Sequence, residues 1–464
     1  MSTFTNAVIN QSARTANGMK AHKSTANSCL DLFYNIGASR GKNIIPSFTA
    51  AHVENPIIAG RIALWSRDVR GGAGERKLFR DILLELTKTD GDRARAMLHK
   101  VPELGRWDDL LVLVGTDLEI SAFEMIRQAL DAKNGLCAKW MPRKGDVAIK
   151  LRNFLGYSPK RYRKTLVELT KVVEQQMCAK EWDKITYDHV PSVAASRYQK
   201  AFNKHDPDGY KTYRDGLATG ETKVNAGAVY PYDIIKAIRI SESTSEVSLA
   251  QWEALPNFVG DASILPMVDV SGSMHCPAGS NPKSSVMCID VALSLGLYLA
   301  DKNKGKFKDT FLTFSHSPQL LHLNGNLIQK MYQMDASNWD MNTNLHAAFN
   351  KVLSVAKEGK VPQSEMPQII LILSDMQFDR CATYDHSAMQ MISHKYEESG
   401  YEMPKVVFWN LNSSFGNVPA KSTDKNVGLV SGFSPAIVKS VLAADDFTPA
   451  GIMMKTIMDV RYDY

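Results

Sequence analysis

The sequence has few cysteines, and no two of them have the C-x-x-C spacing that is typical of structural zinc sites and thioredoxin-like redox motifs. Six cysteines are scattered over 464 residues. A disulfide-stabilised scaffold would have more cysteines at closer spacing. We therefore expect the thiols to be reduced and the protein to be cytoplasmic.

Long hydrophobic runs are also missing. The longest candidate, Val286–Ala300, is interrupted by Asp290, and it is shorter than the roughly 20 apolar residues that cross a membrane as a helix. The first residues lack the apolar segment of a signal peptide. The sequence therefore predicts no membrane partner. Its length is enough for two or three domains with sizeable cores.

The chain has a small net charge of +6, but this charge is unevenly distributed. Residues 1–250 contain 38 Lys and Arg against 28 Asp and Glu, a net +10. Residues 251–464 contain 17 against 21, a net −4. An anionic partner is therefore predicted for the front half alone.

The front half is predicted to be helical. Its clearest segment, Gly74–Lys88, has apolar residues at helical spacing. These residues share one face and are Leu78, Phe79, Ile82, Leu83 and Leu86. Similar segments follow, separated by short Gly and Asp turns, which favours a HEAT-like α-helical solenoid or a helical bundle.

The back half alternates between strands and helices. It follows a polar, acidic segment that begins near Ser241, where we place the domain boundary. Apolar strands such as "ILPMVD" and "PQIILILSD" alternate with helices predicted at Ser284–Asp301, near Leu327–Met334 and near His386–Glu398. This pattern indicates a doubly wound, mostly parallel, Rossmann-like sheet. The predicted fold class is thus α followed by α/β.

Hydroxyl and carboxyl side chains follow the predicted strands at the edge where such sheets bind ligands. Asp269, Ser271 and Ser273 come at the end of the first strand, Thr343 precedes a helix, and Asp375 ends another strand. All five supply hard oxygen ligands, which suit Mg²⁺ or another divalent cation such as Mn²⁺. The sequence therefore predicts a metal site at this edge.

The same pattern resembles the metal-ion-dependent adhesion site of von Willebrand factor A domains, D-x-S-x-S followed by Thr and Asp. The resemblance extends over roughly Ile264–Ser440. It implies that the two serines and the threonine bind the cation directly, while the two aspartates act largely through water. It also implies that an acidic group of a protein partner completes the coordination.

These residues also allow other interpretations. The hydroxyls could merely cap the next helix, and the aspartates could merely end strands. A serine hydrolase would need glycine where Asp269 stands, and a two-metal hydrolytic site would need more clustered carboxylates. His275 and His316 are expected to be surface or loop residues.

The segment Lys139–Lys164 carries the strongest basic cluster of the front half. It contains nine basic residues and one acid, and aromatic residues lie between them. Lys and Arg suit phosphates, and aromatic faces suit unstacked bases, so we expect a small structured or single-stranded RNA. For Trp140 and Phe154 a place in the core is the better interpretation. The candidate RNA-binding residues here are Lys139, Arg143, Lys144, Lys150, Arg152, Lys160, Arg161, Arg163 and Lys164.

Two further basic groups extend this surface. The segment Arg61–Arg80 offers Arg67, Arg70 and Arg76, and its "GGAGER" lacks the ending of a phosphate-binding P-loop. A second candidate set, Arg197, Lys200 and Lys204, follows a helical pattern in which Val193, Ala194 and Phe202 are expected to face inward.

A second resemblance extends from about Asn43 to the C-terminus. "WSRDVRGGAGERKLFR", "LGRWDDLL", "KWMPRK" and "VNAGAVYPYDII" resemble an uncharacterised viral and plant family, which is similar in turn to the Ro autoantigen (TROVE-domain) proteins. This resemblance implies a ring of HEAT-like helices that binds small non-coding RNA, and, for a viral protein, the host cytoplasm. The expected division is an N-terminal segment, 1–42, a helical RNA-binding domain, 43–250, and an A domain, 260–464.

Three functions remain open from the sequence. The first is a non-catalytic RNA-binding scaffold, because no general base, nucleophile and oxyanion group are predicted in one place. The second is a metal-dependent protein-interaction module with an acidic partner. The third and weakest is a metal-dependent RNA-processing nuclease.

Overall fold

The structure is a computed structural model that describes residues 12–15, 17–170, 172–240, 246–278, 286–314, 317–337, 343–378, 388–413 and 417–464. The predicted starts of two helices, Ser284 and His386, lie outside these residues, as do His316 and Cys381. No helix among the described residues is both long and apolar enough to cross a membrane.

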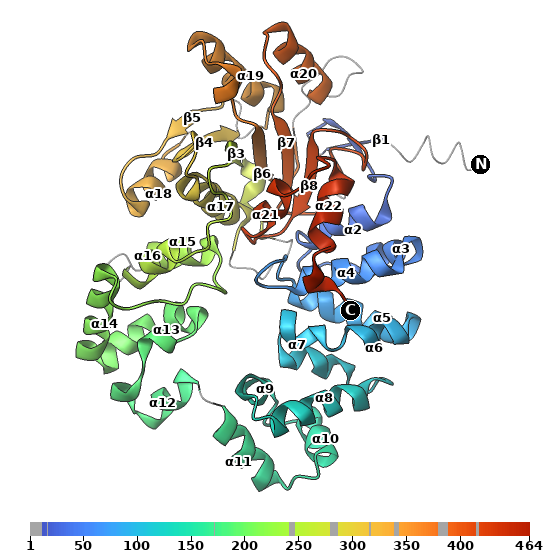
Figure 1. The fold of residues 1–464 in the computed structure, drawn as a ribbon, viewed down its shortest axis with the longest axis vertical. Helices are drawn as coiled ribbons and strands as arrows, with labels where there is room; N and C mark the ends of the chain where they lie inside the picture. The colour runs from blue at the N-terminus through green and yellow to red at the C-terminus, as the bar shows by residue number, and fades with distance from the viewer. Residues whose placement is uncertain are drawn as a thin grey trace.

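The front half forms a small hairpin and a long series of helices. The hairpin pairs β1 (Ser12–Arg14) with β2 (Lys20–His22). The helices are α2 (Ser28–Ile36), α3 (Ile45–Glu54), α4 (Pro56–Arg67), α5 (Arg76–Thr89), α6 (Gly91–Met97), α7 (Lys100–Leu104), α8 (Glu119–Asp131), α9 (Gly135–Trp140), α10 (Asp146–Phe154), α11 (Pro159–Leu169), α12 (Val173–Ala179), α13 (Ser192–His205), α14 (Pro207–Thr219), α15 (Pro231–Ile240) and α16 (Glu246–Glu253). Figure 1 shows that they curve into an arch that leaves the sheet and returns to it.

The back half is a six-stranded sheet with helices on both faces. Its elements are β3 (Ile264–Asp269), α17 (Cys288–Lys302), β4 (Thr310–Phe314), β5 (Leu320–His322), α18 (Leu327–Asp335), α19 (Leu345–Glu358), β6 (Ile369–Ser374), α20 (Ala388–Glu398), β7 (Lys405–Asn410), β8 (Val427–Ser431), α21 (Ile437–Leu442) and α22 (Pro449–Ile457). The strand order is β5-β4-β3-β6-β7-β8, and only β5 is antiparallel to its neighbour. The fold class predicted from the sequence is confirmed.

The alternation of side chains along the central strands explains this layering. On β3, Ile264 and Val268 belong to the core that contains α17, whereas Leu265 and Met267 belong to the core that contains α19. A strand that is apolar at every position can be covered on both faces, which requires helices on both sides of the sheet. After β3 the chain adds β4 and β5 on one side and then β6, β7 and β8 on the other, so the strand order reverses between β3 and β6. Such a switch point opens a crevice at the carboxyl ends of the strands.

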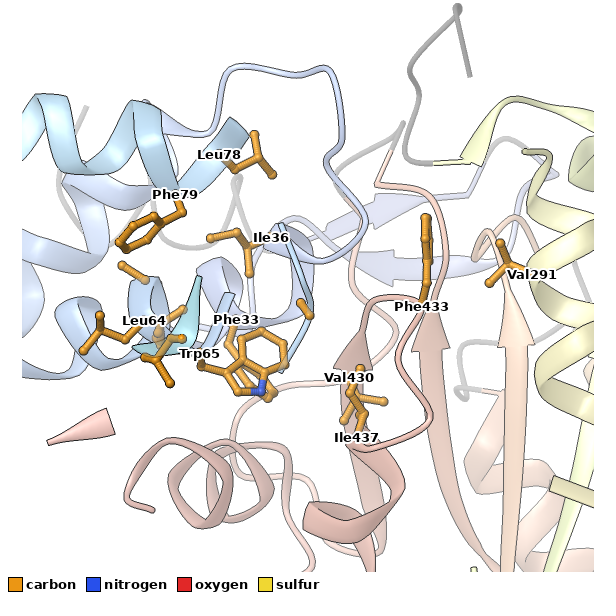
Figure 2. Close-up of a cluster of buried hydrophobic side chains, with 14 of the residues drawn as sticks. Phe33, Ile36, Leu64, Trp65, Leu78, Phe79, Val291, Val430, Phe433 and Ile437 are labelled. Carbon is orange, nitrogen blue, oxygen red and sulfur yellow. The ribbon is translucent and has the colours of Figure 1, made fainter. Parts of the chain in front are cut away.

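Both ends of the arch pack against the sheet unit. Helix α2 contacts β8, α4 contacts α22, and α15 contacts α17. In Figure 2, Phe33, Trp65 and Phe79 of the arch lie in one hydrophobic cluster with Val430 and Ile437 of the sheet unit. The two halves therefore share one core, although a separate aromatic core holds α13 and α14 together.

Candidate metal site and basic surface

Two aspartates lie at the switch point of the sheet. Asp269 is the last residue of β3, and Asp375 follows the last residue of β6. The two strands are neighbours, with Val268 opposite Leu373. The carboxyl groups therefore come from residues more than a hundred positions apart, and the pairing of β3 with β6 brings them to the same edge.

A chain of hydrogen bonds joins the predicted ligands. The Ser271 amide donates to Asp269 Oδ1 at 2.9 Å. The Ser271 and Ser273 hydroxyl oxygens are 3.0 Å apart, and Ser273 Oγ donates to Asp375 Oδ1 at 3.3 Å. Four of the five predicted ligands thus belong to one connected network.

Thr343, the fifth, is buried beside this network. Its hydroxyl donates to the Gln377 carbonyl oxygen at 2.6 Å, and the Gln377 amide donates to Asp375 Oδ1 at 3.3 Å. Thr343 is therefore joined to Asp375 through one residue of the loop after β6.

The electrostatics of the edge favour a cation. Burial, and then the charge of Asp375, raise the pKa of Asp269 to about 7, and burial raises the pKa of Asp375. Among the described residues, no basic side chain forms an ion pair with either carboxylate. Ser273 is exposed, whereas Asp269 and Ser271 are buried, so the network is open on one side. Two buried carboxylates and three hydroxyls fit a divalent cation with one outward position.

Several residues that support this edge were missed from the sequence. Ser374 Oγ donates to Asp269 Oδ2 at 2.6 Å. Thr15 Oγ1 and Asn17 Nδ2, on the turn of the β1–β2 hairpin, donate to the carbonyl oxygens of Phe378 and Gln377 at 2.5 and 2.9 Å. Ser374 could have been found because it ends a strand next to Asp375. Nothing in the local sequence near Thr15 indicates this contact.

The basic residues of α11 form the most exposed part of the predicted RNA surface. Lys160, Arg161, Arg163 and Lys164 are all exposed on the first two turns of this helix, which is at the far end of the arch from the sheet (Figure 1). Among the described residues, only Lys164 of these four has an acidic neighbour, with its Nζ 3.6 Å from an oxygen of Glu168. Arg161 lies over the ring of Tyr157 at 4.0 Å.

The neighbouring basic residues are more constrained. Lys144 is exposed and Arg152 is half-buried, while Lys150 Nζ is 3.5 Å from an oxygen of Glu119. Lys139 is half-buried against Trp140. The Arg143 guanidinium donates to the carbonyl oxygens of Ala138 and Met141 at 2.9 and 2.5 Å, so it caps the end of α9.

The aromatic residues of this segment pack mainly into the core. Phe154 lies 5.5 Å from Phe123 between ring centroids, and Trp140 packs against the main hydrophobic cluster while Arg106 covers its face at 3.6 Å. The core position expected for Trp140 and Phe154 is confirmed, so stacking of bases on these two rings is not supported.

Among the three arginines of the earlier cluster, Arg67 requires a correction. Its side chain is 5% exposed, and its Nε donates to Asp109 at 2.7 Å. This burial leaves it no access to RNA, and its role is to hold α4 against the segment after α7. Arg76 is partly exposed but pairs with Asp108 at 2.6 Å, whereas Arg70 is exposed.

The basic residues of α13 lie on an exposed face. Arg197, Lys200 and Lys204 are all exposed. Phe202 is buried as expected, but the expectation for Val193 was wrong, since it is 44% exposed. In the first turn of α13, Ala195 is buried in the core instead of Val193.

Two family models match parts of the chain. Residues 263–458 match Domain of unknown function (DUF7788), and residues 141–263 match Domain of unknown function (DUF2828). Uncharacterized protein L728 of Acanthamoeba polyphaga mimivirus is 29% identical over 505 residues, which cover 96% of this chain and 86% of the viral protein. The Ro (RSR) protein of Deinococcus radiodurans aligns with a TM-score of 0.48 and 14% identity, covering 93% of this chain and 99% of that one. The chain is therefore similar to a viral protein over nearly all its length.

Proposed function

We propose that this protein is a non-catalytic RNA-binding scaffold whose helical arch binds small structured or single-stranded RNA. The observation that carries the proposal is the set of four exposed basic residues on α11, three of which have no acidic partner among the described residues. Phosphate groups would supply the missing negative charge.

The position of these charges on the helix strengthens the proposal. Lys160 and Arg161 are in the first turn of α11, where the helix dipole favours negative charge. Basic residues at this end raise the free energy of the helix, and among the described residues no acidic side chain pairs with Lys160 or Arg161 to offset it. A bound polyanion would be attracted by both the basic side chains and the positive end of the helix dipole.

The test is the affinity for a labelled hairpin RNA and a labelled single-stranded RNA, measured by fluorescence anisotropy over a range of salt concentrations. In the variant K160E/R161E/R163E/K164E, the affinity at low salt should fall by about 100-fold, and the log–log salt slope should become shallower by about 3. Undetectable binding of both RNAs to the wild type would disprove the proposal.

A matched control separates this surface from net charge. Lys304, Lys351, Lys357 and Lys395 are exposed on the sheet unit. Replacing these four with glutamate changes the net charge by the same amount and should leave most of the affinity intact. Incubation of the bound RNA with Mg²⁺ should leave its length unchanged, whereas cleavage that is lost in Asp375→Ala would favour the nuclease instead.

A second function, metal-dependent binding of an acidic protein partner, is favoured by the geometry of the sheet edge. We propose that Ser271, Ser273 and Thr343 bind Mg²⁺ or Mn²⁺ and that Asp269 and Asp375 orient its waters. The exposed Ser273 marks the side from which a partner carboxylate could approach. A bound cation would supply a positive charge at this point.

Metal binding is tested with Mn²⁺ alone, by electron paramagnetic resonance titration of the full chain. Asp269→Ala and Asp375→Ala should each weaken binding by about tenfold or more. Asp261→Ala is the matched control, because Asp261 is exposed and precedes β3 at its opposite end. Equal affinity in all four proteins would exclude this edge as the metal site.

A further inference from the structure

Two cysteines lie side by side at the rim of the sheet edge that carries Asp269, Ser271, Ser273, Thr343 and Asp375, which we call the metal edge after its proposed function. Cys276 Sγ is 3.5 Å from Cys288 Sγ, and both are thiols in the structure. Cys276 follows the short 3₁₀ helix Gly272–His275, which carries Ser273, and Cys288 is the first residue of α17. The pair therefore connects the loop of the predicted ligands with a core helix.

The backbone holds these two residues opposite each other. Pro277 and Met287 form an antiparallel bridge, and the Cys288 amide donates to the Cys276 carbonyl oxygen at 2.9 Å. Opposite residues in a hydrogen-bonded antiparallel pair have Cα atoms about 5.5 Å apart. This value lies within the range that a disulfide spans, so the sulfurs could bond with little movement of the backbone.

The environment of Cys276 also suits reaction. Cys276 is half-buried, whereas Cys288 is buried, so an oxidant can reach Cys276 first. Asn412 Nδ2 donates to Cys276 Sγ at 3.1 Å. The Cys288 thiol and the Asn412 amide lower the pKa of Cys276 to about 7, which increases the fraction of reactive thiolate.

We propose that Cys276 and Cys288 are an oxidation site, at which a peroxide converts the two thiols to a disulfide that alters the metal edge. The Cys276 thiolate attacks the peroxide oxygen, the O–O bond breaks, and Cys276 becomes a sulfenic acid while one water leaves. The Cys288 sulfur then attacks the Cys276 sulfur, and the second water leaves as the disulfide forms. For each hydrogen peroxide, two thiols lose two hydrogens and two waters are produced.

The effect on the metal site follows from the distances. Bond formation must shorten the Sγ–Sγ separation from 3.5 Å to about 2.05 Å. The shift moves Cys276, which is three residues after Ser273. The Ser273 hydroxyl contacts both Ser271 and Asp375, so movement of this loop should disturb those contacts. The shift also disturbs the contact with Asn412, which lies on the loop after β7. The expected change in metal binding rests on the proposed metal function, whereas disulfide formation itself does not.

The experiment treats the full chain with hydrogen peroxide and maps disulfides by peptide mass spectrometry. We expect a linked Cys276–Cys288 peptide that disappears on reduction with dithiothreitol. Mn²⁺ affinity should change by about tenfold between the oxidised and reduced protein and should recover on reduction. The same treatment of Cys276→Ser should give no link and no change in affinity.

Cys178→Ser provides the matched control, because Cys178 is exposed on α12 and far from the pair in the sequence. This variant should behave as the wild type does. A Cys276 that goes to sulfinic acid without linking to Cys288 would overturn the oxidation site. A disulfide with unchanged Mn²⁺ affinity would overturn only its coupling to the metal, and a link without Mn²⁺ binding in either state would count against the metal function alone.

Discussion

The metal edge and helix α11 satisfy their polar groups in opposite ways. At the metal edge, Asp269 is buried and accepts hydrogen bonds from Ser271 and Ser374. On α11, Arg161 and Arg163 are exposed and have no acidic partner among the described residues. The edge is organised by its own hydrogen bonds, whereas three of the four basic residues of α11 are not neutralised by any acidic side chain among the described residues.

The two sites depend on different features of the chain. The metal edge depends on topology, because strands β3 and β6 must be neighbours for its carboxylates to meet. The basic surface depends only on the local sequence and its exposure. Changes that disturb the fold should therefore affect the edge, while changes of charge should affect α11 and leave the fold intact.

The largest effect should come from breaking the core that joins the two halves. Phe33 is fully buried, lies 4.5 Å from Trp65 between ring centroids, and belongs to the cluster in Figure 2. Phe33→Ala should lower the free energy of unfolding by about 3–5 kcal/mol, because it leaves a cavity. Denaturant titration measures the loss, and hydrogen exchange should show faster exchange in both α2 and β8.

Val53→Ala is the control for this change, since Val53 is 80% exposed on α3 and should alter stability by less than about 0.5 kcal/mol. If Phe33→Ala affected exchange in α2 but not in β8, the two halves would unfold as independent units.

The next largest effect should come from adding the metal. The proposed metal function has the cation bind the folded chain and not the unfolded one, so Mg²⁺ at 100 times its dissociation constant should stabilise the wild type by about 2.7 kcal/mol. Asp375→Asn keeps the shape of the side chain but removes its charge, so most of this stabilisation should be lost. Thermal unfolding with Mg²⁺ and with EDTA measures both proteins, and an equal response would show that the cation acts elsewhere.

The parts of this structure that the sequence predicted are those with a local pattern. The strand "IILILS" is apolar at every position, and β6 is a buried central strand. The D-x-S-x-S spacing placed Asp269, Ser271 and Ser273 together because all three lie within five residues of one strand end. The exposed positive charge on α11 was also predicted, since a cluster of Lys and Arg is expected at the surface.

The parts that the sequence did not predict depend on contacts between distant segments. Arg67 and Arg70 belong to the same basic segment of the sequence, but Arg67 is buried and pairs with Asp109, which is 42 positions away. The hairpin before α2 reaches the loop after β6 through Thr15, a contact that spans 363 positions. The Cys276–Cys288 pair likewise depends on a short antiparallel bridge between Pro277 and Met287. The two cysteines do not have C-x-x-C spacing, so no motif predicts that they are close.

A smaller effect is expected from the contact between the hairpin and the metal edge. Thr15 Oγ1 donates to the Phe378 carbonyl oxygen and accepts from the Met19 amide at 2.9 Å. Thr15→Val removes both bonds with little change of shape, which should cost about 1–2 kcal/mol of stability. Thr89→Val is the control, because its hydroxyl bonds to Glu85 at an exposed helix end. If Thr15→Val leaves Mn²⁺ affinity unchanged, the hairpin stabilises the loop without positioning the site.

The smallest effect should have the opposite sign, and it sets α11 apart from the metal edge. Lys160→Gln removes positive charge from the start of the helix, so it should raise stability by about 0.3–0.5 kcal/mol at low salt. Arg161→Gln also loses the contact with the Tyr157 ring, so its gain should be smaller. Lys357→Gln removes a positive charge from the last turn of α19 and should lower stability by a similar amount. Denaturant titrations at low and high salt measure these changes, which should shrink as salt screens the charges. A loss of stability in the α11 variants would mean that these residues serve the fold, and the argument for a polyanion on α11 would lose its basis.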